Sequence, residues 1–325
     1  MAKMLYRDAV RMALEEEMLR DENVFLIGED IGLAGGDWKC TEGLQAKFGP
    51  WRVMDSPISE SGFTGLGVGA AIVGMRPVVE IMFGDFLFVA MDQICNQAAK
   101  ITYMSGGQVA VPLTIRTCIG SVNSSAAQHS QMMHSMFAHC PGLKVVLPST
   151  PYEVKGLLKT AIRENSPVLF YEHKRLYSTQ FEVPEEEYTI PFGVARIAHP
   201  GKDLTVVATS YMAILATKVA EELEKDGISV EVIDPRTIVP LDRETICRSV
   251  KKTGRLLIVD EGHASYGISG EIAMAVMEKN FYDLDAPIER MCAADVPVPF
   301  SPVLEQEVIP DEKAIRAAIL RMLDI

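Results

Sequence analysis

Residues 143–171, LKVVLPSTPYEVKGLLKTAIRENSPVLFY, decide the fold class of this 325-residue chain. The segment begins with an apolar strand at Leu143–Pro148, continues through a helix at Pro151–Arg163 and ends in a second apolar strand at Pro167–Tyr171. Strands that are apolar at successive positions, rather than at alternate ones, are typical of a parallel sheet buried on both faces. The segment therefore predicts a β–α–β unit of an α/β fold.

The same alternation extends in both directions from this unit. Upstream, the sequence predicts strands at Val24–Gly28, Pro77–Met82 and Pro112–Cys118, and helical stretches at Tyr6–Leu19, Ser59–Met75 and Phe86–Met104. Downstream, a polar stretch with prolines precedes a second series of strands and helices from Leu204 to Met322. We therefore expect two α/β domains with mainly parallel sheets, at residues 1–175 and 203–325, joined by a linker at 176–202.

The composition favours an acidic globular protein. The chain is 48% hydrophobic and 23% charged, and its formal net charge is −13. Nucleic-acid binders concentrate Lys and Arg, so we expect no nucleic-acid partner. The longest apolar stretch, around Gly65–Met75, is too short to cross a bilayer, so we expect no membrane association either. The six cysteines are scattered without a C-x-x-C pair, which indicates reduced thiols and a cytoplasmic location.

The segment Gly65–Ala70, GLGVGA, is close to the glycine fingerprint of dinucleotide-binding proteins. That fingerprint requires glycines in the turn between a strand and a helix. Here the glycines lie inside a helical stretch that has already begun near Ser59. This placement favours close packing of the helix against another helix or a partner chain, and leaves dinucleotide binding as the weaker alternative.

Two polar residues are candidates for acid–base chemistry. His129 lies in a loop of small polar residues after a buried strand, and loops at the carboxyl ends of strands are where open α/β sheets bind ligands. Glu60 lies in a similar loop, at the start of a helix. Each has a plainer explanation, because His129 could be an exposed loop residue and Glu60 could simply favour the positive end of the helix dipole.

The combination of motifs is more specific than any single residue. The chain contains 55–62 DSPISESG, 74–86 GMRPVVEIMFGDF, 92–107 DQICNQAAKITYMSGG, 126–131 AAQHSQ, 138–150 AHCPGLKVVLPST, 172–177 EHKRLY, 233–242 IDPRTIVPLD, 258–261 IVDE and 297–302 PVPFSP. In these blocks it resembles the β subunit of the thiamine-diphosphate-dependent first component of 2-oxo acid dehydrogenase complexes. The resemblance implies a pyrimidine-binding domain followed by a transketolase C-terminal-like domain.

The resemblance also implies roles for particular residues. Glu60 matches the glutamate that hydrogen-bonds N1′ of the cofactor's aminopyrimidine, and His129 matches the histidine that steers reductive acylation of the lipoyl group. The residues expected to bind the cofactor are Ile58, Glu60, Met82 and Phe86. A family potassium site would fall at Leu113, Ala161, Ile162, Glu164 and Ser166, although Glu164 and Ser166 depart from the usual residue types there.

An absent motif predicts a partner. Thiamine-diphosphate enzymes hold Mg²⁺ and the diphosphate with a G-D-G motif followed by Asn-Asn, and this sequence contains neither. The chain is therefore expected to supply half of a cofactor site. A separate α subunit would hold most of the thiamine diphosphate and Mg²⁺ in an α2β2 heterotetramer. The resemblance adds two further partners, the dihydrolipoyl acyltransferase core and its lipoyl domain.

The expected reaction is decarboxylation of a 2-oxo acid and transfer of the acyl group to lipoamide. Blocks 126–131 and 172–177 favour pyruvate or acetoin over a branched-chain 2-oxo acid, and pyruvate dehydrogenase of the acetyl-transferring type is the main interpretation. Alternatives from other classes are a non-catalytic binding protein on the same fold, a transketolase complete in one chain and a nicotinamide-dependent oxidoreductase.

Overall fold

The computed structural model describes residues 2–325, which fold into two compact units. The first unit comprises residues 2–119 and 136–192, and the second comprises residues 120–135 and 193–325. The stretch at 176–202, expected to be a linker, contains two strands, and residues 120–135 group with the second unit. The expected α/β class with mainly parallel sheets is confirmed in both units.

The first unit is built on a parallel sheet whose strands are buried on both faces. Six strands lie in the order β6-β7-β5-β4-β2-β3, and every neighbouring pair is parallel. They are β2 (Val24–Gly28), β3 (Val53–Asp55), β4 (Arg76–Phe83), β5 (Thr114–Ile119), β6 (Lys144–Val146) and β7 (Val168–His173). Two further strands, β1 (Ala2–Leu5) and β8 (Gln180–Val183), form a separate antiparallel pair.

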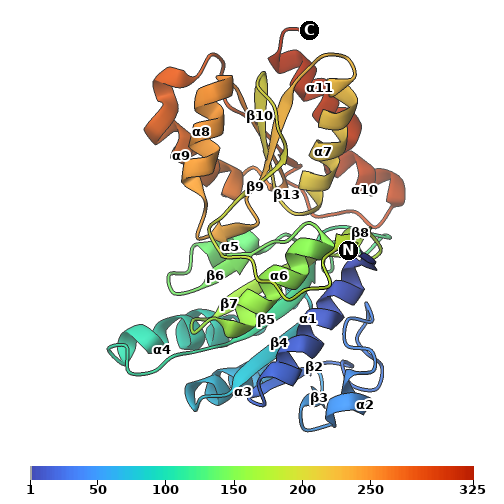
Figure 1. Ribbon diagram of the computed structural model, residues 1–325, viewed down its shortest axis with the longest axis vertical. Coiled ribbons are helices and arrows are strands. Elements are labelled where there is room, and N and C mark those ends of the chain that lie inside the picture. The colour runs from blue at the N-terminus through green and yellow to red at the C-terminus, as the bar shows by residue number, and fades with distance from the viewer. Residues whose placement is uncertain (1) are drawn as a thin grey trace. The chain divides into compact units, whose positions relative to one another are not determined.

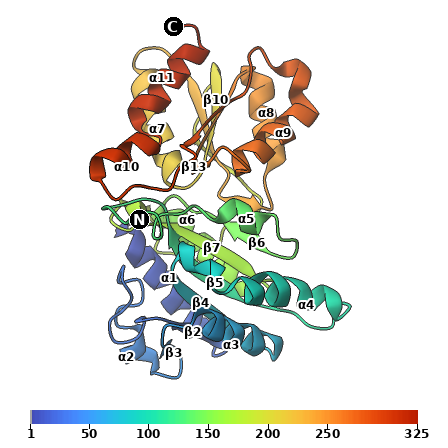
Figure 2. The same ribbon diagram turned by 180° about the vertical axis from the view of Figure 1, so that it is seen from behind.

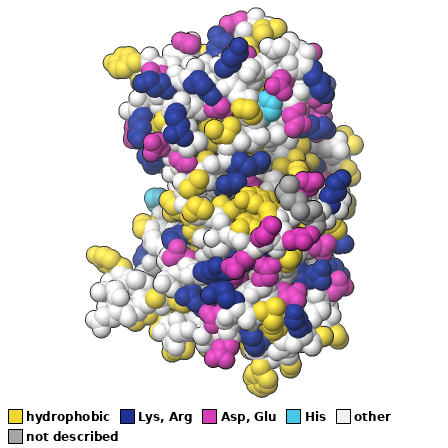
Figure 3. Space-filling model, viewed as in Figure 1, with side chains coloured by type: hydrophobic (Ala, Val, Ile, Leu, Met, Phe, Trp, Pro, Cys, Tyr) yellow, Lys and Arg dark blue, Asp and Glu magenta, His cyan; other side chains and the backbone are white. Residues whose placement is uncertain are grey.

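Helices cover both faces of this sheet. Helices α1 (Tyr6–Arg20) and α6 (Pro151–Arg163) lie side by side on one face, and α3 (Glu60–Ile72) and α4 (Ala99–Met104) lie on the other (Figures 1 and 2). Acidic and basic side chains are interspersed over the α1/α6 face (Figure 3), where Arg163 pairs with Glu17 at 2.6 Å. The remaining helical segments are α2 (Leu44–Phe48), η1 (Gly84–Phe88), η2 (Gln93–Ala98) and η3 (Lys174–Leu176). The short helix α5 (His134–Ala138) begins in residues of the second unit and ends in residues of the first.

Helix α6 begins where its sequence predicts. Thr150 caps the helix by accepting a hydrogen bond from the backbone N–H of Glu153, and the Glu153 carboxylate accepts the N–H of Thr150 in return. Pro151 occupies the first turn, where a missing N–H costs nothing. This reciprocal capping box fixes the β6–α6–β7 unit from which the fold class was inferred.

The second unit contains a five-stranded sheet in the order β14-β13-β10-β11-β9. Its strands are β9 (Arg196–His199), β10 (Leu204–Ala208), β11 (Val230–Asp234), β13 (Leu256–His263) and β14 (Glu289–Ala293), with a further short strand β12 (Thr237–Val239). Only β9, at the edge, is antiparallel to its neighbour.

Helices again cover both faces of the second sheet. Helices α7 (Tyr211–Glu224) and α11 (Glu312–Met322) pack on one face, and α8 (Arg243–Thr253) and α9 (Ile268–Asn280) lie on the other (Figure 1). The short helical segments are η4 (Phe281–Asp283) and α10 (Pro302–Val308). None of the helices in the described part of the chain has the length and apolarity required to span a bilayer.

Candidate functional site

The residues expected to contact the cofactor gather at one edge of the first sheet. Strands β4, β2 and β3 are neighbours and run parallel, so their carboxyl ends lie along the same edge. Ile58 and Glu60 follow β3, Met82 lies near the end of β4, and Phe86 lies in η1 directly after it. The fold therefore brings these four residues, distant along the chain, to a single edge.

Glu60 shares this edge with a second buried carboxylate, Glu29. Glu60 is the first residue of α3 and is 6% exposed, whereas Glu29 directly follows β2 and is 8% exposed. Burial raises the pKa of Glu29, and the neighbouring carboxylate of Glu60 raises it further. Oε1 of Glu29 is buried and has no hydrogen-bond partner among the described residues. Glu29 can therefore hold a proton, and both carboxylates can accept hydrogen bonds from a ligand at this position.

Glu29 was not among the candidate residues inferred from the sequence. Its signal was present, because an acidic residue immediately follows the apolar strand VFLIG, at the end of a strand where ligands bind. What the sequence could not give was the order β4-β2-β3, which places Glu29 beside Glu60.

An apolar and aromatic group lies on the same edge as the two carboxylates. The rings of Phe83 and Phe86 meet edge to face, with centroids 6.2 Å apart and an interplanar angle of 87°. Met82 is half-buried, and its carbonyl accepts a hydrogen bond from Sγ of Cys118 at 3.0 Å. Ile58 is 84% exposed. Aromatic faces and aliphatic side chains of this kind suit a flat heterocycle.

His129 lies in the second unit, in the loop at residues 120–135. Its side chain is half-buried. Three residues of this loop that are not glycine adopt left-handed backbone conformations, with φ of 51° at Asn123, 58° at Ser124 and 59° at Ala126. Such conformations cost about 1 kcal/mol or more each and cluster at functional sites, where surrounding contacts hold them.

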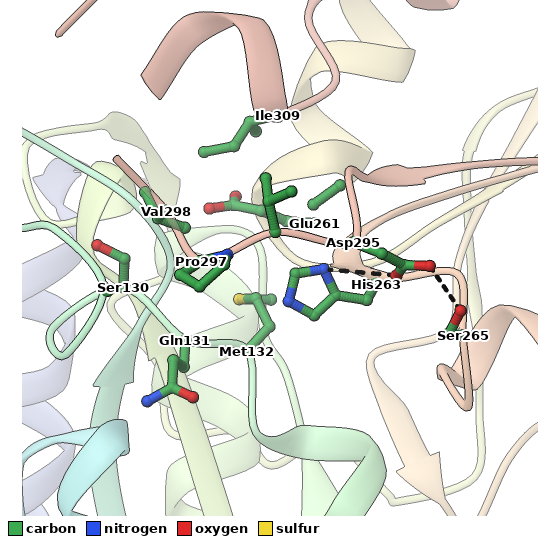
Figure 4. Close-up of a pocket in the computed structure, with 13 residues that line it drawn as sticks. Ser130, Gln131, Met132, Glu261, His263, Ser265, Asp295, Pro297, Val298 and Ile309 are labelled. Carbon is green, nitrogen blue, oxygen red and sulfur yellow. Dashed lines mark hydrogen bonds and ion pairs between the residues drawn. The ribbon is translucent and has the colours of Figure 1, made fainter. Parts of the chain in front are cut away.

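A cavity of about 450 Å³ in the second unit adjoins this loop (Figure 4). The loop contributes Ala127, Ser130, Gln131 and Met132, and the remaining lining comes from residues 261–309 of the same unit. At one side, Nδ1 of His263 lies 2.8 Å from the carbonyl of Ala294 and 3.9 Å from Oδ1 of Asp295. Ser265 donates to Oδ2 of Asp295 at 2.6 Å. No sequence motif had singled out His263 or Asp295.

Several oxygens expected to bind potassium already interact with two cationic side chains, Arg76 and Lys144. Nη1 of Arg76 donates to the carbonyls of Ile162 and Glu164 at 3.0 and 3.1 Å, and Nζ of Lys144 pairs with the Glu164 carboxylate. Although burial raises it, the pKa of Glu164 is lowered overall, chiefly by the hydrogen bond from Lys144.

The other expected potassium ligands are engaged as well. The carbonyl of Ala161 accepts the N–H of Glu164, that of Leu113 accepts the N–H of Val168, and the Ser166 hydroxyl donates to Glu164. Potassium therefore stays a prediction that no contact supports. Among the described residues, no group of three or more His, Cys, Asp or Glu is arranged to hold a metal ion.

The glycines of α3 do not all serve one purpose, so the close helix–helix packing expected from Gly65–Ala70 holds for Gly65, which lies against η2, but not for Gly67. A Cβ at Gly67 would lie 2.6 Å from Cγ2 of Val79 on β4, so this glycine lets the helix approach its own sheet rather than a partner chain. A Cβ at Gly65 would meet Gln93 of η2 at 3.3 Å, and one at Gly69 would meet nothing within 4 Å. The outward face of α3 therefore contains Gly69, with Leu66 and Val73, which are both exposed.

The sequence matches two protein families in succession. Residues 2–180 match the family described as transketolase, pyrimidine binding domain, and residues 193–315 match transketolase, C-terminal domain. The "2-oxoisovalerate dehydrogenase subunit beta" of Bacillus subtilis is 44% identical, and the alignment covers all of both chains. The chain belongs to the transketolase-like family of β subunits of the first (E1) component of 2-oxo acid dehydrogenases.

Other relatives of this E1 β-family chain are named for different substrates. The "Acetoin:2,6-dichlorophenolindophenol oxidoreductase subunit beta" of Cupriavidus necator is 48% identical, covering 97% of this chain and 96% of the relative. The mitochondrial "Pyruvate dehydrogenase E1 component subunit beta" of Pisum sativum is also 48% identical, covering 97% and 89%.

A solved structure agrees with the E1 β family in fold. It is described as "Split gene transketolase, inactive beta4 tetramer", superimposes with a TM-score of 0.79 and covers 99% of this chain and 98% of its own, at 21% identity. At that identity the likeness concerns the fold alone.

Proposed function

We propose that the chain is the β subunit of a 2-oxo acid dehydrogenase of the pyruvate, acetyl-transferring type. With an α subunit it decarboxylates a 2-oxo acid and reductively acylates lipoamide. The observation that carries the proposal is the pair of buried carboxylates, Glu60 and Glu29, at the strand ends of a domain that matches the pyrimidine-binding family. Relatives named for pyruvate, acetoin and 2-oxoisovalerate, all aligned over nearly their full lengths, support the reaction class.

The residues at the sheet edge fit half of thiamine diphosphate. Glu60 would accept a hydrogen bond from the protonated ring nitrogen of the aminopyrimidine, and the orphaned Oε1 of Glu29 marks a position where a further donor would be favourable. Met82 and Phe86 would form the apolar wall against the ring. When bound, thiamine diphosphate supplies the electron sink for cleavage of the bond beside the substrate carbonyl.

Glu60 is suited to hold and release a proton. It is the first residue of α3, and its carboxylate lies beside the buried carboxylate of Glu29, where it would face the ring nitrogen. With the cofactor bound, Glu60 would exchange a proton with the ring nitrogen, and Met82 and Phe86 would limit the access of water.

The diphosphate and Mg²⁺ are assigned to an α subunit in an α2β2 heterotetramer, because the sequence lacks the motif that holds them. The outward face of α3, with Leu66, Gly69 and Val73, is the proposed contact surface, since small side chains let a partner helix approach closely.

The acyltransferase core and its lipoyl domain complete the proposed set of partners. The six cysteines, all free thiols in the described structure, support a cytoplasmic location.

Calorimetric titration of thiamine diphosphate and Mg²⁺ tests the half-site directly. We expect no measurable heat of binding with this chain alone, and binding in the micromolar range or tighter once a coexpressed α subunit is present. The reconstituted enzyme is then assayed with pyruvate, acetoin and a branched-chain 2-oxo acid, and we expect pyruvate to have the highest kcat/KM. Tight binding by the lone chain would overturn the division of the cofactor site between two subunits.

We expect substitution of His129 by alanine to affect the two half-reactions differently. The proposed role of His129 is to donate a proton to the lipoyl group, or to orient it, during acyl transfer. Acylation of lipoamide should therefore fall by about 10²-fold, whereas decarboxylation measured with 2,6-dichlorophenolindophenol should change little. Parallel assays of one preparation give this ratio. Equal losses in both assays would assign His129 to cofactor or substrate binding instead.

A further inference from the structure

The loop that carries His129 is fastened to the second unit at its beginning. The backbone N–H of Ser121 donates to Oε1 of Glu261 at 2.7 Å, and the Ser121 hydroxyl donates to the carboxylate of Glu305. The N–H of Ser124 reaches the other oxygen of Glu305 at 3.3 Å. Ser121, Glu261 and Glu305 are all buried, so water competes little for these bonds.

The same loop is fastened at its end by a buried pair. Nε2 of His134 lies 3.1 Å from Oδ2 of Asp260, and both side chains are completely buried. Thr209 donates to the other oxygen, Oδ1 of Asp260, at 2.5 Å. Burial raises the pKa of Asp260, but the charge and hydrogen bond of His134, with the bonds from Thr209 and the Gly262 backbone, lower it overall.

Gly262 provides the room for this pair. A Cβ at that position would lie 2.7 Å from Oδ2 of Asp260 and 3.2 Å from Cε1 of His134. Asp260 and Glu261 are successive residues of β13, so this one strand supplies a carboxylate to each end of the loop. Between the two anchors lie His129 and the three left-handed residues Asn123, Ser124 and Ala126.

We infer that His134 is a positioning residue, which acts with Asp260 to clamp the strained loop so that His129 is held in one place. A strained backbone persists only where its surroundings fix it, and the two anchors hold this loop at both ends. Without the His134–Asp260 pair, the loop would relax toward ordinary backbone angles and His129 would sample several positions. The inference rests on the role of His129 proposed above.

The test compares three variants of the full chain, alone and with the α subunit. His134→Ala removes one partner, and Gly262→Ala displaces the Asp260 carboxylate without deleting any group of the pair. Ser249→Ala is the matched control, because Ser249 is also buried and bonds Thr205 at 2.7 Å in the same unit, away from the loop. If His134→Ala does not fold because the buried Asp260 carboxylate loses its histidine partner, the double variant His134→Ala/Asp260→Ala replaces it.

Two readouts follow each variant. Hydrogen exchange of residues 122–132 should accelerate by about tenfold or more in His134→Ala and Gly262→Ala but not in Ser249→Ala. In the reconstituted enzyme, the ratio of lipoamide acylation to 2,6-dichlorophenolindophenol reduction should fall by about tenfold in the first two variants only. In a His129→Ala background, His134→Ala should lower the ratio no further, because it acts through His129.

Each result bears on a separate claim. Unchanged exchange in both variants would overturn the clamp, and faster exchange with an unchanged ratio would overturn its positioning role. A further fall of the ratio in the double variant His129→Ala/His134→Ala would show that His134 acts by another route. If His129→Ala itself leaves the ratio unchanged, the proposed role of His129 fails, and the exchange data alone decide whether the pair holds the loop.

Discussion

Glu60→Gln should lower 2-oxo acid turnover by about 10²- to 10⁴-fold while the heterotetramer still assembles. Glutamine keeps the size of the side chain and one hydrogen-bond acceptor, but it cannot exchange a proton with a ring nitrogen. Because Glu60 lies in a buried position beside Glu29, a water molecule cannot readily take over this proton exchange in the variant. Steady-state turnover of pyruvate with an artificial acceptor, together with sedimentation of the reconstituted enzyme, measures both parts of the expectation.

A second glutamate separates catalysis from the helix dipole. Glu312 also occupies the first position of a helix, α11, where it pairs with Lys218 at 2.9 Å on the surface. Glu312→Gln should cost at most about 1 kcal/mol of stability and leave turnover unchanged. If Glu60→Gln retained the wild-type rate, like this control, Glu60 would have only the dipole interaction and the proposed site would lose its central residue.

Gly67→Leu is expected to destabilise the first domain by about 3 kcal/mol or more, because the new side chain has no room against β4. The Cβ alone would approach Val79 to 2.6 Å and Leu113 to 3.3 Å, and both neighbours are buried. Thermal unfolding of the full chain measures this loss. The variant should therefore misfold, and its loss of assembly with an α subunit would not report on the interface.

Gly69→Leu, two residues along the same helix, provides the matched comparison. Nothing lies within 4 Å of a Cβ at this position, and leucine favours helix over glycine by about 0.5–1 kcal/mol. We expect this variant to fold with equal or greater stability but to lose association with the α subunit, as seen by size-exclusion chromatography. Normal assembly of a folded Gly69→Leu chain would remove α3 from the proposed interface.

Local signals in the sequence were sufficient to predict the limits of elements that have an unbroken apolar run or a capping box. The limits of β2 and α6 agree with those expected, because β2 is an unbroken apolar run and α6 has a capping box. The stretch Phe86–Met104 differs from the continuous helix expected there. It comprises η1, a turn, the π-helical segment η2 and α4, since hydrophobic spacing does not reveal a change in hydrogen-bond register.

Pairings between distant residues could not be inferred in the same way. Strand β8 lies in a polar stretch and exists because it pairs with β1, which is at the other end of the first unit's sequence. His134 and Asp260 are likewise separated by 126 residues, and although Asp260 lies in the block 258–261, nothing in the sequence pairs it with His134. Glu60 was a candidate from its polar loop at the start of a helix, and Ile58, Met82 and Phe86 followed only from the family resemblance. That the His129 loop belongs to the second unit depends on contacts that only the fold creates.

The path of the chain has a consequence for engineering chimeras. The polypeptide passes between the two units at residues 119–120, 135–136 and 192–193, so the second unit is not one contiguous piece of sequence. A graft of residues 193–325 alone would omit the loop that engages Asp260, Glu261 and Glu305, and would leave three buried acidic groups short of partners. Exchanging this domain between relatives therefore requires residues 120–135 from the same parent.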